Sequence, residues 1–139
     1  MAMQTTVERI DGPTPVTVMT LAGELDASNY LRLVDDVRPI HASGARHLLL
    51  DLTDLTFISS SGLVSLYSIL KVMQGEEPPD PEYGWSALHE MERGAEEGGE
   101  QNAVRLAGMR PDVAGVLQRT GLDALFPSHP DRESALAAF

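Results

Sequence analysis

Residues 48–70, LLLDLTDLTFISSSGLVSLYSIL, constrain the fold of this chain more than any other segment. The segment opens with a continuously apolar run that stops at Asp51, which is typical of a strand covered on both faces. Further on, apolar residues recur at helical spacing. We therefore expect a central strand over residues 47–51, then a short loop, then a helix that begins at the serine triplet 59–61.

The serine triplet places hydroxyl groups at the start of this helix. Serine is a preferred N-cap because its oxygen accepts a hydrogen bond from a backbone N–H that has no partner within the helix. One cap requires one serine, so capping explains only part of the triplet. A phosphoryl group on Ser60 or Ser61 would be stabilised by the free N–H groups and the helix dipole. Two interpretations stay open, a structural cap and a site that accepts phosphate.

Strand and helix patterns alternate along the rest of the chain. Gly12 and Pro13 predict a turn that joins the first two strands in an antiparallel hairpin. The alternation indicates an α/β fold with a mostly parallel sheet, and 139 residues suit one domain. The further strands are expected over residues 4–10, 16–22 and 104–106, and the further helices over residues 29–42, 111–120 and 132–139.

Acidic residues outnumber basic ones by 21 to 10, giving a net charge of −11. This balance disfavours direct binding to nucleic acid or to an anionic membrane. Residues 74–102 hold nine of the acidic residues and one basic residue, together with three prolines and five glycines. Such a composition cannot bury enough apolar surface to order itself, so we expect a flexible acidic insertion.

Three apolar residues inside the insertion fall three positions apart, namely Trp85, Leu88 and Met91. One interpretation is a short helical segment that docks on a partner when it folds. The other is that these side chains cover part of the domain's own surface. Both interpretations remain open from the sequence.

The residues that enzyme and cofactor sites require are missing. The chain has no cysteine, and its four histidines show no metal-ligand spacing, so neither a metal nor a cofactor is expected. A nucleophile elbow needs a glycine two residues before its serine, where Ser59 stands. The chain's one lysine is Lys71, which lies after the serines and so cannot complete a phosphate-binding P-loop. We therefore expect a binding protein and not an enzyme.

Segments that direct a protein to or through a membrane are also missing. The first twelve residues are polar, and no run approaches about 20 consecutive apolar residues. A cytoplasmic protein without membrane insertion is the expectation.

The motif LDLTDLTFISSSGL resembles the signature of the STAS domain, the fold of anti-sigma factor antagonists. The family's pattern is a strand ending in Asp-Leu-Ser or Asp-Leu-Thr, an apolar pair, then Asp-Ser-Ser-Gly or Asp-Ser-Thr-Gly. Here the corresponding parts are residues 51–53, the pair Phe57 and Ile58, and residues 59–62. Residues 23–26, GELD, and residues 113–127, VAGVLQRTGLDALFP, match further family segments in the same order. The resemblance implies a sheet of four to five strands with helices mainly on one face.

The resemblance also implies phosphorylation-controlled partner switching. In the family, a partner kinase phosphorylates the hydroxyl residue that immediately precedes the glycine. The corresponding residue here is Ser61, with Ser60 as the second choice. The unphosphorylated protein binds an anti-sigma factor serine kinase and frees the sigma factor, and phosphorylation breaks this complex. The contact surface that the resemblance implies consists of Asp26, Ser59, Ser60, Ser61, Gly62 and Leu63.

Other uses of the same fold remain open. Ser59 stands where phosphorylated members usually carry aspartate, which favours two alternatives without switching. One is a scaffold subunit of a stressosome-like assembly, and the other is a small subunit of a lipid-transport ABC complex. Asp26 is either a surface acid that contacts the partner or an N-cap of the following helix. Self-association is a further open possibility.

Overall fold

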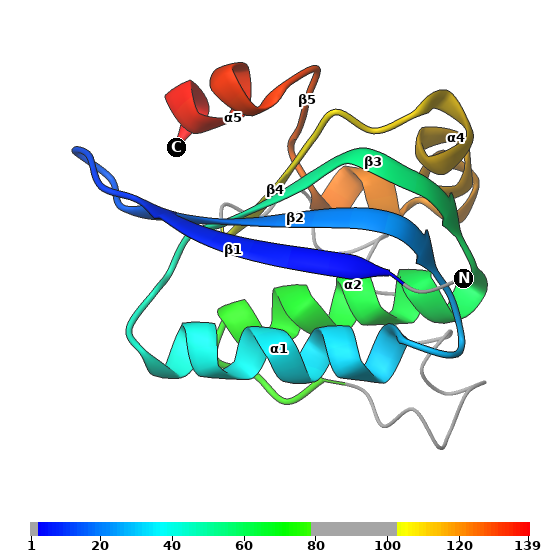
Figure 1. Cartoon of the computed structure of the whole chain (residues 1–139), viewed down its shortest axis with the longest axis horizontal. Helices are drawn as coiled ribbons and strands as arrows, with labels where there is room; N and C mark the ends of the chain where they lie inside the picture. Colours follow the sequence, from blue (N-terminus) through cyan, green and yellow to red (C-terminus); the bar gives the residue numbers. More distant parts are fainter. Residues whose placement is uncertain (1–2, 79–102) are drawn as a thin grey trace.

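Five strands form one sheet in the computed structural model, which describes residues 3–78 and 103–139. Figure 1 shows the sheet with β1 at one edge. β1 pairs antiparallel with β2, and the other neighbours are parallel, so the expected mixed, mostly parallel sheet is confirmed. The strands, in their order across the sheet, are β1 Gln4–Ile10, β2 Val16–Leu25, β3 Leu48–Ile58, β4 Val104–Ala107 and β5 Ser128–His129.

Helices lie on both sides of the sheet, although the longest two share one face. In Figure 1, α1 and α2 run side by side below the sheet and α5 lies above it. Within the described residues, no helix is both long and apolar enough to cross a membrane. The helices are α1 Tyr30–Ala42, α2 Ser60–Met73, α4 Pro111–Thr120, the 3-10 turn η2 Leu122–Leu125 and α5 Arg132–Ala138.

The central strand is buried on both faces, as its continuous apolar run predicts. Leu48, Leu49 and Leu50 are each 0% exposed. Leu48 and Leu50 belong to the larger core, which is shared with α1 and α2, whereas Leu49 belongs to a smaller core beneath α5. Because side chains alternate along a strand, a strand between two cores must be apolar at every position.

Two strands extend beyond their predicted ends. The expected loop after residue 51 is part of β3, and β2 continues through the expected turn to Leu25. Their pairing contains two irregularities, and Gly23 lies in the left-handed region with φ 106°. These bulges break the alternation of buried residues, so the sequence pattern in this part of β3 does not indicate a strand.

In the C-terminal part of the chain, one predicted helix is confirmed and two short elements were missed. The helix over residues 111–120 is confirmed, with Pro111 in its first turn and Gly121 in the left-handed conformation at its end. The short β5 and the turn η2 were missed, because two to four residues give too little periodicity. Most of the expected acidic insertion, including Trp85, Leu88 and Met91, lies outside the described residues.

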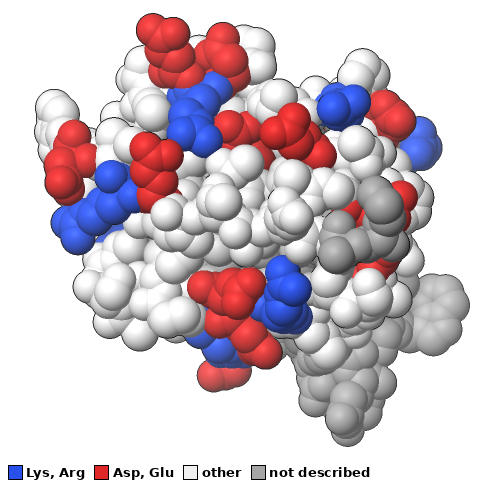
Figure 2. All heavy atoms as spheres, in the orientation of Figure 1, with Lys and Arg blue, Asp and Glu red and all other residues white. Residues whose placement is uncertain are grey.

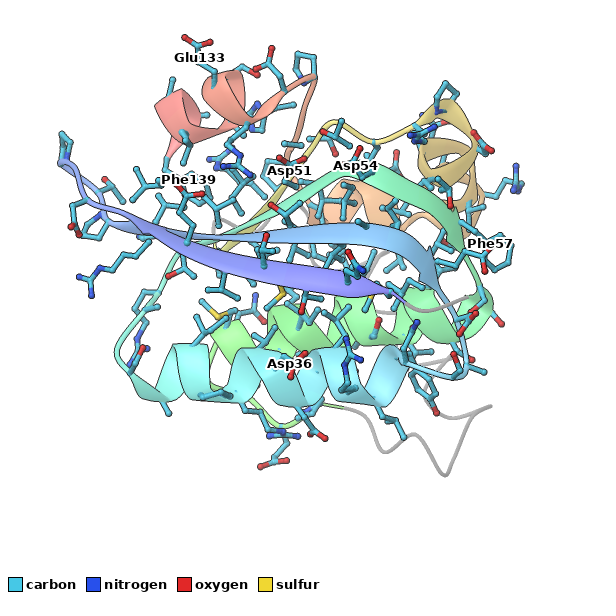
Figure 3. The ribbon with its side chains drawn as sticks, in the orientation of Figure 1. Asp36, Asp51, Asp54, Phe57, Glu133 and Phe139 are labelled. Carbon is cyan, nitrogen blue, oxygen red and sulfur yellow. The ribbon has the colours of Figure 1, made fainter. Side chains whose placement is uncertain are left out.

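A contact across the sheet holds α5 in place. Arg132 donates from Nε to Asp51 Oδ2 at 3.2 Å, from Nη2 to Thr20 Oγ1 at 2.9 Å and from Nη1 to Glu8 Oε2 at 3.1 Å. Figure 3 shows Asp51 between the sheet and α5. Burial alone would raise the pKa of the Asp51 carboxyl. Hydrogen bonds from Thr53, followed by the contact with Arg132, outweigh burial and hold this pKa below its ordinary value.

The start of α2 is packed closely against the ends of β2 and β3. A Cβ atom on Gly62 would lie 2.6 Å from Ile58 Cγ1, 2.9 Å from Leu25 Cγ and 3.0 Å from the Leu25 carbonyl oxygen. Backbone of a paired strand cannot move aside as an exposed side chain can. Glycine at this position is therefore required for the close approach of helix and sheet.

We predict that Asp51→Asn lowers the free energy of unfolding at neutral pH by about 1–3 kcal/mol, because Arg132 loses a charged acceptor. A lowered folded-state pKa stabilises the protein above an aspartate's ordinary pKa of about 3.9, and this contribution is lost as the pH falls through the folded-state value. The difference from wild type should therefore shrink in strong acid. Urea unfolding across the acidic pH range measures it.

The matched control is Asp11→Asn, since Asp11 pairs with Arg9 at a site where both side chains are more than two-thirds exposed. This change should cost less than about 1 kcal/mol. A deficit of Asp51→Asn that persists unchanged in strong acid would contradict the account.

We predict that Gly62→Ala destabilises the protein by about 1–3 kcal/mol, because the methyl group overlaps β2 and β3. Gly115→Ala is the control within α4. A Cβ there meets only Arg119 Nη1, at 3.5 Å, so alanine should be neutral or stabilising by up to about 1 kcal/mol. Chemical denaturation compares the two variants, and equal stability of Gly62→Ala and wild type would refute the packing argument.

Candidate functional site

The candidate site lies where two strands end and two helices begin. β2 and β3 are parallel and end side by side, with Leu25 paired to Ile58. α1 and α2 start at this same end of the sheet (Figure 1). When parallel strands are followed by helices, the helix N-termini lie at the carboxyl ends of the strands, a frequent location for binding sites in α/β folds.

Ser59 is the N-cap of α2. Its Oγ accepts a hydrogen bond from the Gly62 N–H at 3.2 Å, and its carbonyl accepts one from the Leu63 N–H at 3.1 Å. Its own N–H donates to the Leu25 carbonyl at 2.9 Å, which attaches the cap to β2. Aspartate is an equally good N-cap, so serine here retains the cap and removes a negative charge from the site.

Ser60 and Ser61 form the first two positions of α2. Ser60 is exposed and Ser61 is partly exposed. Because Ser59 supplies the cap, neither hydroxyl is needed for it. The N–H groups of the first helical turn carry the positive end of the helix dipole. A phosphate on either hydroxyl would therefore lie in favourable surroundings without disturbing the helix.

Asp26 lies immediately beyond the strand end to which Ser59 is bonded. Its Oδ1 accepts hydrogen bonds from Ser28 Oγ at 2.6 Å and from the Ser28 N–H at 2.9 Å. These bonds, the side-chain one first, lower the pKa of Asp26. Asn29 and not Asp26 holds the N-cap position of α1, and its amide joins the turn to the Asp26 N–H. Asp26 is thus a charged surface group beside the serines and not a helix cap.

The remaining two residues of the expected contact surface are buried. Leu63 is 3% exposed and belongs to the larger core, and Gly62 is buried against β2 and β3. Tyr67 is likewise 3% exposed. Leu63 and Gly62 therefore shape the site from within, and the exposed surface is formed by their neighbours.

An exposed aromatic ring lies at the same end of the molecule and was missed from the sequence. Phe57 is 48% exposed, whereas its neighbour Ile58 is 4% exposed. Figure 3 shows Phe57 at the end of β3, pointing away from the body of the protein. Leu31, in the first turn of α1, is also 48% exposed. The direction of the Phe57 side chain follows from the bulged pairing of β2 and β3, which the sequence pattern did not indicate.

The described residues offer no ready metal site. No group of three or more histidine, aspartate or glutamate side chains among them is arranged to hold an ion. Asp26 and the positive end of the α2 helix dipole both lie at this end of the sheet. The arrangement is suited to contact with another macromolecule through hydroxyls, a carboxylate and apolar side chains.

Comparison with known proteins finds similar proteins that align with nearly the full length of the chain. The chain is 26% identical over 137 residues to BtrV of Bordetella bronchiseptica, a candidate anti-sigma factor antagonist, covering 99% of this chain and 95% of BtrV. Among solved structures, it is similar to an anti-sigma factor antagonist from Mycobacterium paratuberculosis, with a TM-score of 0.68, 23% identity and coverage of 99% and 93% of the two chains.

A second solved structure, of the Bacillus cell fate determinant SpoIIAA in its phosphorylated form, also shares the fold. The TM-score is 0.57 with 15% identity, covering 96% of this chain and 98% of that one. A sequence model of the STAS domain matches residues 4–76, slightly more than half of the chain. This segment contains both strand ends and both helix starts of the candidate site. The chain therefore belongs to the STAS domain family.

Proposed function

We propose that this protein is an anti-sigma factor antagonist that acts in the cytoplasm by phosphorylation-controlled partner switching at Ser61. Its partner would be an anti-sigma factor serine kinase, and the protein itself would act by binding and not by catalysis. The names of BtrV and of the Mycobacterium paratuberculosis protein support the general role. The existence of SpoIIAA in a phosphorylated form supports modification within this fold.

The observation that carries the proposal is that Ser59 alone caps α2, so the hydroxyls of Ser60 and Ser61 are not used for capping. Ser59 caps α2, so Ser60 and Ser61 remain at the helix start without a structural task. Phosphorylation would add about −1.5 to −2 charges there. A partner surface that accepts a neutral hydroxyl would then have to bury a bulky charged group, which is unfavourable unless the charge is paired. The partner would dissociate without any refolding of this protein.

Two exposed apolar side chains support the proposal that the partner is a protein. Within the described residues, three large apolar side chains are exposed, and two of them, Phe57 and Leu31, lie at the serine end of the molecule. Exposed aromatic rings near the centre of an interface often contribute much of its binding free energy. Apolar contacts would hold the partner, and the serine would control its release.

A scaffold or transport subunit that lacks switching is the second candidate, favoured by Ser59. The carboxylate that phosphorylated family members usually carry at this position is absent. If a kinase requires that carboxylate, wild-type protein would not be phosphorylated, whereas Ser59→Asp would be. This outcome would favour the second candidate, because the natural chain would then be a constitutive binder.

We predict that Ser61→Asp binds the partner kinase at least about tenfold more weakly than wild type, equivalent to ~1.4 kcal/mol. Ser61→Ala should bind as wild type does and should not be phosphorylated. Capture from the native cell identifies the partner, titration with the purified partner gives the Kd, and intact mass reports phosphate. Ser43→Ala and Ser43→Asp are the matched controls, because Ser43 is exposed at the C-cap of α1, away from the serine end, and they should keep binding and phosphorylation within a few-fold. Retention of one partner by all variants, with no phosphate on any, would contradict the proposal.

We predict that Phe57→Ala makes the free energy of partner binding about 1–2 kcal/mol less favourable. The free energy of unfolding should not change, because the ring is half exposed in the free protein. Val7→Ala, another exposed apolar residue far from the serine end along β1, should leave this binding unchanged. Isothermal titration with both variants measures the effect. If Phe57→Ala binds as tightly as wild type, the ring is not part of the interface.

A further inference from the structure

β1 is an open edge of the sheet. It pairs with β2 along all seven of its residues, and no described strand lies on its other side. Five of its residues are exposed and two are partly exposed. The outward N–H and C=O groups of such a strand form a row that another extended strand can pair with. This edge is separate from the serine site and does not depend on the proposed function.

Several of the usual protections of an edge strand are missing from β1. The strand contains no proline and no lysine, and its register with β2 is unbroken. Its two charged residues are already paired within the chain, Glu8 with Arg132 at 3.1 Å and Arg9 with Asp11 at 3.2 Å. Natural edge strands that stay unpaired are usually blocked by bulges, prolines or charged side chains, and of these three β1 has only charged side chains.

Val7 extends the apolar core to this edge. It is 55% exposed, the highest value among the large apolar residues described, and it pairs with Met19, which is 0% exposed and belongs to the larger core. Residues paired across two strands lie on the same face of the sheet. Val7 therefore lies on the face that α1 and α2 cover, at its outer margin. A second apolar side chain beside Val7 would continue this core.

We propose that β1 pairs antiparallel with β1 of a second copy of this chain, about a two-fold axis through Val7. This register places Val7 opposite Val7, Glu8 opposite Thr6 and Arg9 opposite Thr5, so all seven residues pair. An axis through Glu8 or Arg9 would instead place like charges directly opposite each other, which is destabilising. The sheet would continue from one subunit into the next, through an interface in which both subunits use the same surface.

The surface around β1 agrees with this arrangement. Figure 2 shows the face on which β1 lies nearest the viewer, with uncharged surface across its middle and charged groups along its borders. On α1, Arg32 and Asp36 form an ion pair at 3.7 Å. Charges that are already neutralised in pairs oppose the approach of a second copy less than free charges would.

The first test compares Val7→Asp with Gln118→Asp by sedimentation equilibrium of the full chain. Gln118 is exposed on α4, so both variants carry the same added charge. Wild type and Gln118→Asp should form a concentration-dependent dimer. Val7→Asp should raise the dimer Kd at least about tenfold, because two carboxylates would face each other on the axis. A wild type that stays monomeric throughout, or a dimer that Val7→Asp leaves intact, would overturn the proposal.

The second test uses the absence of cysteine from the chain. Paired residues of antiparallel strands have Cα atoms about 4.5–5.5 Å apart, within the range that a disulfide can span. Val7→Cys should therefore form a disulfide-linked dimer under mild oxidation, at a far higher yield than Gln118→Cys. Equal yields would mean that random collision forms the disulfide, and the register through Val7 would be wrong.

Discussion

The parallel pairing of β2 and β3 out to Leu25 and Ile58 is the constraint on which the rest of the structure depends. It brings two strand ends together and therefore two helix starts. The Ser59 N–H is bonded to the Leu25 carbonyl, and Gly62 permits α2 to approach the same strand end. Had either strand ended where its apolar pattern predicts, Asp26 and the serine triplet would not share a surface.

The same pairing would let a rigid site respond to the proposed phosphorylation. The cap and the glycine contact hold the backbone of the helix start, whereas the hydroxyls of Ser60 and Ser61 lie outside these contacts. A charge added there changes the surface and leaves the fold unchanged. On the opposite face, the contact of Arg132 with Asp51 attaches α5 to the sheet, so the C-terminal helix stabilises the central strand from the other side.

Much of this arrangement could be predicted from the sequence, for identifiable reasons. The apolar run 48–50 is buried on both faces because it separates two cores, and Pro111 and Gly121 mark a helix through their own backbone preferences. Features set by contacts distant in sequence could not be predicted. The exposure of Phe57 depends on bulges in the pairing of two strands, and the partner of Asp51 is 81 residues away in the sequence.

Phosphorylation of Ser61 in the native cell is the central claim, and site-resolved mass spectrometry tests it most directly. Trypsin cleaves after Arg46 and Lys71, so one peptide, residues 47–71, carries the whole triplet. We expect a single phosphate on this peptide in part of the protein, with fragment ions that place it on Ser61. A peptide that carries no phosphate in any growth condition, or carries it only on Ser59, would contradict the account.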